Sequence, residues 1–436
     1  HITELTLPSN LINITAHAFE GLESLETLVF MANGDSALEY IGVRAFAECV
    51  SLKELNLPDE LKRIGAEAFI NCLAIRDINL PYQSELYEIG ERAFKNNRTL
   101  RQFITNSNLA IIQDEAFYGC MSLTDFDDTY SKESLIYLGS DVFEGTPYYT
   151  SLRENNPNTL IYLGRVAYEY NGFLADRTLI VLEQNTYSLS PNLFRDPSHK
   201  IHKITTIRPQ QITQTVVVLN MTLKIIGRHA FANNPNLTEA ILPLDLEYIG
   251  DFAFEGCTAL ANIEFDNDEN LKYIGHNAFE DTLWYQSLFQ AHENNSVVYI
   301  GNVAYAYKGQ GEEYFDIRLD ENTVSVSPFA FDNQDKLLTF YMPSSILNIS
   351  QFAFGRDFES GEKALTTIYL EEGGENIAGI FSLASKVILN SMPVKLKGSA
   401  VYSYIENIDG ENVRVYDFMD VFELIELLVS EDIMPH

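Results

Sequence analysis

Residues 51–72, SLKELNLPDELKRIGAEAFINC, contain every feature of a short unit that recurs along this chain. The leucines follow an L-x-x-L-x-L pattern whose end alternates like a β-strand. Pro58 ends this strand because it has no N–H to donate to a sheet. Gly65 permits a tight turn, and the Ala-Glu-Ala-Phe segment after it is typical of a single helical or 3₁₀ turn. A unit this short cannot form a core alone, so it must bury its leucines against the next unit.

The phrase Ile-Gly-x-x-Ala-Phe and its close variants recur through most of the sequence. Their aromatic residues are 23 to 27 residues apart, except for one gap of 37 residues that contains an excursion at about 198–216. A period of this length indicates a solenoid. We therefore predict a β-rich α/β solenoid with parallel strands on its concave face and a single helical turn in each coil. The aligned residues are Phe19, Phe46, Phe69, Phe94, Phe117, Phe143, Tyr168, Phe194, Phe231, Phe254, Phe279, Tyr305, Phe331 and Phe354.

The sequence also predicts a second level of organisation. Phe94 and Phe231 are 137 residues apart, as are several later pairs, so a block is duplicated at about 94–230 and 231–367. We expect one long, gently curved solenoid over 1–395, with about 14–16 coils. Residues 396–436 are expected to form a C-terminal cap that includes an amphipathic helix at about 417–433, and an alternative role for this helix is partner binding.

The charge balance excludes some partners. The chain has 62 acidic and 29 basic residues and a formal net charge of −33, whereas nucleic-acid binding requires clustered Lys and Arg. The same charge disfavours anionic membranes and favours a monomer, because copies of the chain repel each other. The longest apolar stretch, 377–394, contains Lys386, so we expect no membrane insertion.

The sequence contains no recognisable catalytic or metal-binding motif. It has no H-E-x-x-H, no G-x-S-x-G and no phosphate loop, so we expect no enzyme activity and no cofactor. Each cysteine lies three residues after a repeat Phe, which favours buried thiols over disulfides or zinc. A weakly held surface cation at the dense acidic clusters is an alternative use of those carboxylates. The cysteines are Cys49, Cys72, Cys120 and Cys257.

The combined pattern L-x-x-L-x-L-P and I-G-x-x-A-F-x-x-C resembles the bacterial leucine-rich repeat proteins of the BspA type. The resemblance covers about residues 1–395 and implies a leucine-rich-repeat right-handed superhelix. The chain departs from better-known leucine-rich repeats because Pro largely replaces the turn asparagine, as at Pro8, Pro58 and Pro81. The family implies a secreted or cell-surface protein of host-associated bacteria and some protozoa, used in adhesion and protein contact. No signal peptide is recognisable in the given chain.

Candidate binding residues are the outward positions of the first strand of each coil, together with two aromatic inserts. If the coils stack in register, like charges such as Glu54 and Asp77 lie above each other, which costs stability unless solvent or cations screen them. We expect a solvated acidic face, and the alternative is a docking strip for a basic partner. The insert aromatics are expected to pack under a loop, and the alternative is that they stack on a sugar or a protein. The candidates are Glu54, Asp77, Asp125, Asp127, Glu264, Tyr341, Tyr369, Trp284, Tyr285, Tyr148 and Tyr149.

These observations favour a non-enzymatic extracellular or cell-surface recognition protein. The expected partner is a protein, such as a host extracellular-matrix or serum protein, or a surface glycan. The alternatives are a carbohydrate-binding component of a surface glycan-degrading system, a structural spacer that holds another domain, and a hydrolase.

Overall fold

The computed structural model divides the chain into two compact units, unit 1 at His1–Asn234 and unit 2 at Pro235–His436. The residues that it describes are 2–30, 36–174, 177–191, 193–194, 200–211, 213–309, 313–334, 336–343, 345–350, 353–354, 367–370, 402–408 and 411–417.

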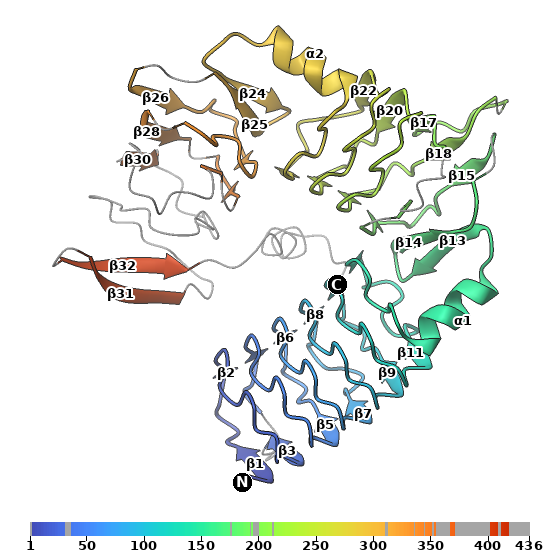
Figure 1. Cartoon of the computed structure of the whole chain (residues 1–436), viewed down its shortest axis with the longest axis vertical. Coiled ribbons are helices and arrows are strands. Elements are labelled where there is room, and N and C mark those ends of the chain that lie inside the picture. Colours follow the sequence, from blue (N-terminus) through green and yellow to red (C-terminus); the bar gives the residue numbers. More distant parts are fainter. Residues whose placement is uncertain are drawn as a thin grey trace. The chain divides into compact units, whose positions relative to one another are not determined.

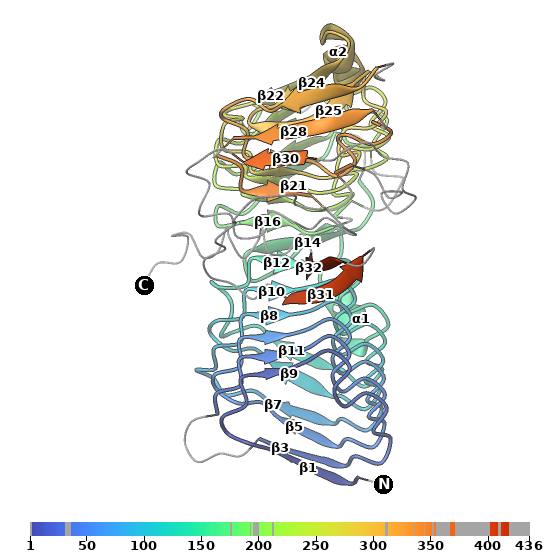
Figure 2. The same cartoon turned by 90° about the vertical axis from the view of Figure 1, so that its left-hand side faces the viewer.

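Each coil in the first part of unit 1 contributes one longer strand and one two-residue strand. The two kinds of strand form separate parallel sheets on opposite sides of the coils (Figures 1 and 2). The predicted parallel solenoid is therefore confirmed. The longer strands are β1(Glu4–Leu7), β3(Thr27–Phe30), β5(Glu54–Asn56), β7(Asp77–Asn79), β9(Gln102–Ile104) and β11(Asp125–Asp127). The short strands are β2(Asn13–Ile14), β4(Tyr40–Ile41), β6(Arg63–Ile64), β8(Glu88–Ile89), β10(Ile111–Ile112) and β12(Tyr137–Leu138).

The Ala-Phe segment of each coil consists of successive tight turns in place of the predicted single helical turn. In one coil Ala45 N donates to Gly42 O at 3.1 Å and Cys49 N donates to Phe46 O at 3.3 Å. Arg44 and Glu48 have left-handed φ values of 53° and 62°, so a right-handed helix cannot continue through them. Alternate donors face the next coil, and Phe46 N donates to Ala68 O at 2.8 Å.

A column of stacked phenylalanine rings forms the centre of unit 1. Phe46, Phe69 and Phe94 are fully buried, and adjacent centroids in this trio are 5.3 and 5.4 Å apart. The rings are nearly parallel because each coil repeats the same backbone conformation. The coils therefore bury their apolar side chains against each other, as the repeat predicts.

The position three residues after each Phe holds this column together. Cys72 Sγ donates to Phe46 O at 3.1 Å, and Cys120 Sγ donates to Phe94 O at 3.2 Å. All four cysteines are free and buried, so the predicted buried thiols are confirmed. Burial raises the pKa of Cys49 to about 11 and that of Cys120 to about 12.

The second part of unit 1 begins with an insert, helix α1(Pro147–Asn155) followed by the antiparallel hairpin β13(Thr159–Leu163) and β14(Val166–Asn171). The coil pattern then resumes. The excursion predicted at 198–216 contains a strand, β17, that pairs in parallel with β18. The remaining strands are β15(Leu179–Val181), β16(Ser188–Leu189), β17(Lys203–Thr205), β18(Val216–Val218) and β19(Ile225–Ile226).

Unit 2 repeats this plan. Coils with parallel strands are followed by helix α2(Leu283–Ala291) and the antiparallel hairpin β24(Ser296–Ile300) and β25(Val303–Lys308), and then by further coils. The coil strands are β20(Glu239–Leu242), β21(Tyr248–Ile249), β22(Asn262–Phe265), β23(Tyr273–Ile274), β26(Phe315–Arg318), β27(Ser325–Val326), β28(Leu337–Met342), β29(Asn348–Ile349) and β30(Thr367–Leu370).

The described part of the predicted C-terminal cap is an antiparallel pair, β31(Tyr402–Ile408) and β32(Glu411–Asp417). The helix predicted at 417–433 lies outside the described residues, apart from Asp417 at the end of β32.

Candidate docking face and inserts

The longer strands of unit 1 present three exposed columns of side chains, which together we call the docking face. The predicted register of the outward rows is confirmed, because Glu54 pairs with Asp77 and Gln102 pairs with Asp125. The first column, just before the strands, is Glu26, Lys53, Arg76, Arg101 and Thr124. The second is Thr27, Glu54, Asp77, Gln102 and Asp125. The third is Val29, Asn56, Asn79, Ile104 and Asp127, of which Asp127 is half-buried.

The first column makes the docking face mixed in charge, which the sequence analysis missed. Its residues are stacked by backbone hydrogen bonds, such as Arg76 N to Lys53 O at 3.0 Å. Lys53 forms an ion pair with Glu26 in the same column. In the part of the chain that the structure describes, Arg76 and Arg101 form no ion pair. Two exposed guanidinium groups therefore lie beside the predicted acidic column.

An exposed aromatic pair lies at the end of the docking face. Tyr82 and Tyr130 each lie three residues beyond the third column, after β7 and β11, and their rings meet at 4.7 Å between centroids. Their side chains are 54% and 49% exposed, and Ile104 on the intervening coil is 42% exposed. The rings meet across an intervening coil because that coil has the small Ser107 at the same position. Exposed tyrosines that are already held in place are typical anchors of protein interfaces.

Two acidic residues beside this pair have local partners. The side chain and backbone N–H of Thr129 lower the pKa of Asp127, whose Oδ1 accepts from Thr129 N at 2.9 Å. Asp128 Oδ2 accepts from Gly164 N at 3.0 Å and so holds the turn between β13 and β14. Asp125 and Asp127 therefore belong to the docking face, whereas Asp128 has a structural role.

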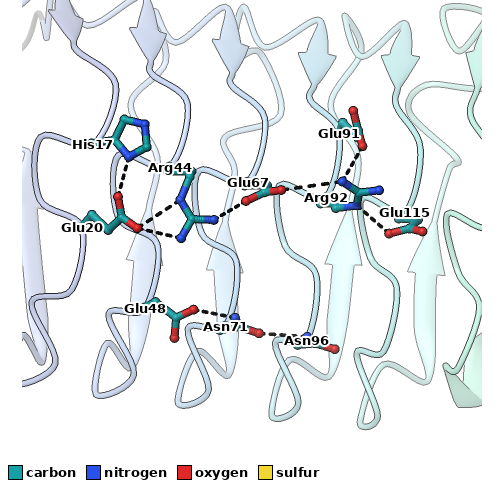
Figure 3. Close-up of polar contacts among 10 residues, drawn as sticks. All are labelled: His17, Glu20, Arg44, Glu48, Glu67, Asn71, Glu91, Arg92, Asn96 and Glu115. Atoms are coloured by element: carbon teal, nitrogen blue, oxygen red, sulfur yellow. Dashed lines mark hydrogen bonds and ion pairs between the residues drawn. The ribbon is translucent and has the colours of Figure 1, made fainter.

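The turns of unit 1 carry a separate ladder of charged side chains on another edge of the coils (Figure 3). Arg44 bridges Glu20 and Glu67, and Arg92 Nε donates to Glu115 Oε2 at 2.7 Å. Arg44, together with His17, lowers the pKa of Glu20. Burial opposes ionisation of Glu115, but Lys95 and Arg92 outweigh it and its pKa is lowered. Because these charges neutralise each other, the ladder connects coils and is a weaker candidate for ligand binding.

The predicted site residues of unit 2 lie on the corresponding strands. Glu264 is exposed on β22. Tyr341 on β28 is half-buried and pairs in register with Tyr369 on β30. The guanidinium of Arg318 lies 4.2 Å from the centroid of the Tyr341 ring, so this ring already has a partner.

The four predicted insert aromatics pack mainly against the coils beneath them. Tyr148 contacts Phe143 at 5.2 Å between centroids, and Tyr149 is buried. In unit 2, Trp284 contacts Phe279 at 5.0 Å, and Tyr285 contacts Tyr305 at 5.3 Å. These contacts favour the packing role expected from the sequence.

A hydroxyl–carboxylate pair lies under the first insert. Tyr149 Oη donates to Glu169 Oε2 at 2.7 Å, and both side chains are buried. Burial, and then the charge of Glu169, raise the pKa of Tyr149. Arg153 Nε lies 3.7 Å from Glu169 Oε1. No sequence pattern indicates this cluster, because it depends on both the position of α1 and the register of the hairpin.

Two features are absent from the described ranges. No group of three or more His, Cys, Asp or Glu side chains there is arranged to hold a metal ion. None of the helices in those ranges is long and apolar enough to span a bilayer.

Solved structures similar to this chain are bacterial repeat proteins. A leucine-rich repeat protein from Bacteroides ovatus is 18% identical over 87% of this chain and 74% of its own, with a TM-score of 0.31. A leucine-rich cell surface protein from Faecalibacterium prausnitzii is 17% identical over 87% and 83%, with a TM-score of 0.27. The pneumococcal vaccine antigen PcpA is 19% identical over 86% and 70%, with a TM-score of 0.30. No curated protein matches the chain.

The repeat itself matches a family model. The model of the BspA type leucine-rich repeat region, in 6 copies, matches residues 1–124, 33–150, 88–223 and 224–358. These matches cover most of the sequence and coincide with the coils described above. The chain therefore belongs to the family of BspA-type leucine-rich repeat proteins.

Proposed function

We propose that this protein is a non-enzymatic extracellular or cell-surface recognition protein that binds a protein partner through the docking face of unit 1. The observation that carries the proposal is the exposed Tyr82–Tyr130 pair beside columns of registered charged side chains. The BspA-type family to which the repeats belong supports the extracellular or cell-surface location. Host extracellular-matrix and serum proteins are the partners that we would test first.

The chemistry of the docking face suits a folded protein surface. Stacked coils repeat at about 4.8 Å, so the columns extend over roughly 20 Å, which fits one side of an ordinary protein interface. Two tyrosines and Ile104 supply apolar anchors, and the charged columns supply a polar rim. The partner must present acidic groups to Arg76 and Arg101 and basic groups to Asp77 and its neighbours.

Capture from soluble matrix and serum proteins tests this proposal. The immobilised chain is compared with a Tyr82→Ala/Tyr130→Ala variant and with a Glu23→Gln control outside the docking face. We expect the double variant to lose at least about 2 kcal/mol of binding free energy, or roughly thirtyfold in affinity, because anchor residues dominate interfaces. The control should bind like the wild type.

The salt dependence gives a second readout. Raising the ionic strength from about 0.02 M to 0.15 M should slow association, because charges of the docking face steer the partner. Equal capture by the wild type and the double variant would refute the docking face as the binding site. Absence of any saturable capture would favour the spacer alternative.

A further inference from the structure

The insert of unit 1 contains a cleft between helix α1 and the hairpin β13–β14. Its volume is about 500 Å³, and the side chains that matter here are Glu144, Tyr149, Arg153, Glu154, Asn158 and Asn171. All of them belong to the insert or to the turn just before it. The cleft is thus distinct from the docking face.

The floor and one wall of the cleft are held rigidly by hydrogen bonds. Tyr149 forms the floor and donates to the buried Glu169, and the Arg153 guanidinium lies 5.6 Å from the centroid of the Tyr149 ring. Arg153 Nε donates to Asn171 Oδ1 at 3.1 Å. Asn171 Nδ2 in turn donates to the backbone oxygens of Arg153 and Asn156 at 2.6 and 2.8 Å. Arg153 is therefore oriented before any ligand arrives.

The remaining polar groups of the cleft are open to a ligand. Within the described ranges, the side-chain carboxylates of Glu144 and Glu154 and the side-chain amide of Asn158 have no hydrogen-bond partner. The terminal nitrogens of Arg153 are also unoccupied there, since its described hydrogen bond uses Nε. The cleft thus offers donors on one side and acceptors on the other.

We propose that this cleft binds a saccharide unit. The two open carboxylates repel an anion such as phosphate, and a free ammonium has no acceptor for the hydrogen-bond donors of Arg153. A neutral ligand whose groups both donate and accept satisfies all of these side chains, and sugar hydroxyls have this property. The exposed ring of Phe173, directly after the cleft residue Gly172, provides an apolar surface next to the cleft at 63% exposure.

Unit 2 contains a copy of the insert without this chemistry. Phe289 and Ala306 stand where unit 1 has Arg153 and Glu169. Lys308 stands where unit 1 has Asn171, and its Nζ donates to the backbone oxygens of Gln290 and His292. The ammonium group therefore fixes the end of α2 just as the Asn171 amide fixes the end of α1. The second insert supplies a matched control within the same chain.

Saturation-transfer NMR with a panel of neutral mono- and disaccharides tests the inference. We expect at least one sugar to bind the full chain, and its affinity to fall at least about tenfold in Asn158→Ala and in Glu154→Gln. Both side chains are exposed, and a thermal unfolding scan confirms that each variant is folded. The Gln290→Ala variant, at the position of Glu154 in the second insert, should bind like the wild type.

Several results would overturn the inference. These are no transfer to any sugar at about 10 mM, equal transfer to the wild type and both cleft variants, or binding of inorganic phosphate or cadaverine in preference to sugars. The Tyr82→Ala/Tyr130→Ala variant should bind the sugar normally. A failure of the sugar-binding proposal for the cleft is therefore distinguishable from a failure of the protein-binding proposal for the docking face.

Discussion

The inserts of unit 1 and unit 2 have the same backbone design but different chemistry. Each helix begins after a threonine whose Oγ1 accepts from the N–H three residues on, Thr146 for α1 and Thr282 for α2. Each hairpin has its register shift at the corresponding place, at Ile161/Tyr162 and at Val298/Tyr299. The two inserts thus share one backbone geometry, while the side chains that this backbone carries differ.

The difference between the inserts lies in what fills the space beneath the helix. In unit 1 the Tyr149 hydroxyl bonds to the buried Glu169 and leaves a polar cleft (Figure 1 shows both inserts). In unit 2, Tyr285 packs against Phe289 and Tyr305. A repeated scaffold can therefore keep its packing in both copies and reserve one copy for recognition.

The largest expected effect is the loss of stability when a stacked aromatic ring is removed, and we expect it in both units. Phe94→Ala in unit 1 and Phe279→Ala in unit 2 should each cost about 3–5 kcal/mol, because both rings are fully buried in aromatic columns. Denaturant unfolding followed by hydrogen exchange in each unit measures the cost. If either ring were replaceable at less than about 1 kcal/mol, the stacked column would not be the core of that unit.

Removing the hydroxyl of one tyrosine in each insert should distinguish the two inserts. Tyr149→Phe should cost about 1–3 kcal/mol because it leaves the buried Glu169 carboxylate without its hydroxyl donor. Tyr285→Phe should cost less than about 0.5 kcal/mol, because its burial is due to ring packing. Thermal unfolding of the two variants side by side gives the comparison. Equal costs would show that the inserts do not differ as described.

The N-terminal caps of α1 and α2 should respond alike to substitution of their threonines. Thr146→Ala and Thr282→Ala should each cost about 1 kcal/mol, because each hydroxyl caps a helix and also donates to the backbone oxygen of a repeat Phe. Exchange rates of the first amides in α1 and α2 report the loss. A response in only one insert would contradict the shared backbone design.

The smallest expected effect is a local loss of stability at acidic pH. The pKa values of Glu20 and Glu115 are lowered below the ordinary value of 4.5, so their ion pairs contribute stability above that pH. This contribution should disappear as the pH falls through the lowered pKa values. At the corresponding edge of unit 2, Phe252 and Phe329 each contact His276. Amide protection factors measured between pH 5 and 3 should therefore fall first in the turns of unit 1, and a uniform fall in both units would contradict this.

The sequence predicted the register of the docking face because the coil period alone determines which residues become neighbours. Glu54 over Asp77 and Tyr341 beside Tyr369 follow from aligning the repeat aromatics. The basic column was missed for a local reason. Strand alternation predicts that Lys53 points inward, but it lies just before the strand begins, where the chain is still turning.

Contacts that depend on two distant side chains were beyond sequence reasoning. The Tyr82–Tyr130 pair requires a small residue at Ser107 in the coil between them. The Tyr149–Glu169 pair requires both the helix position and the register shift of the hairpin. The block boundaries at 94–230 and 231–367 remain predictions from the sequence.

Hydrogen–deuterium exchange of the full chain, alone and with a captured protein partner, tests most directly whether recognition is located in unit 1. We predict slowed exchange in the segments that contain Tyr82, Ile104 and Tyr130, with residues 235–309 unchanged. Slowed exchange confined to residues 235–309 would contradict the account.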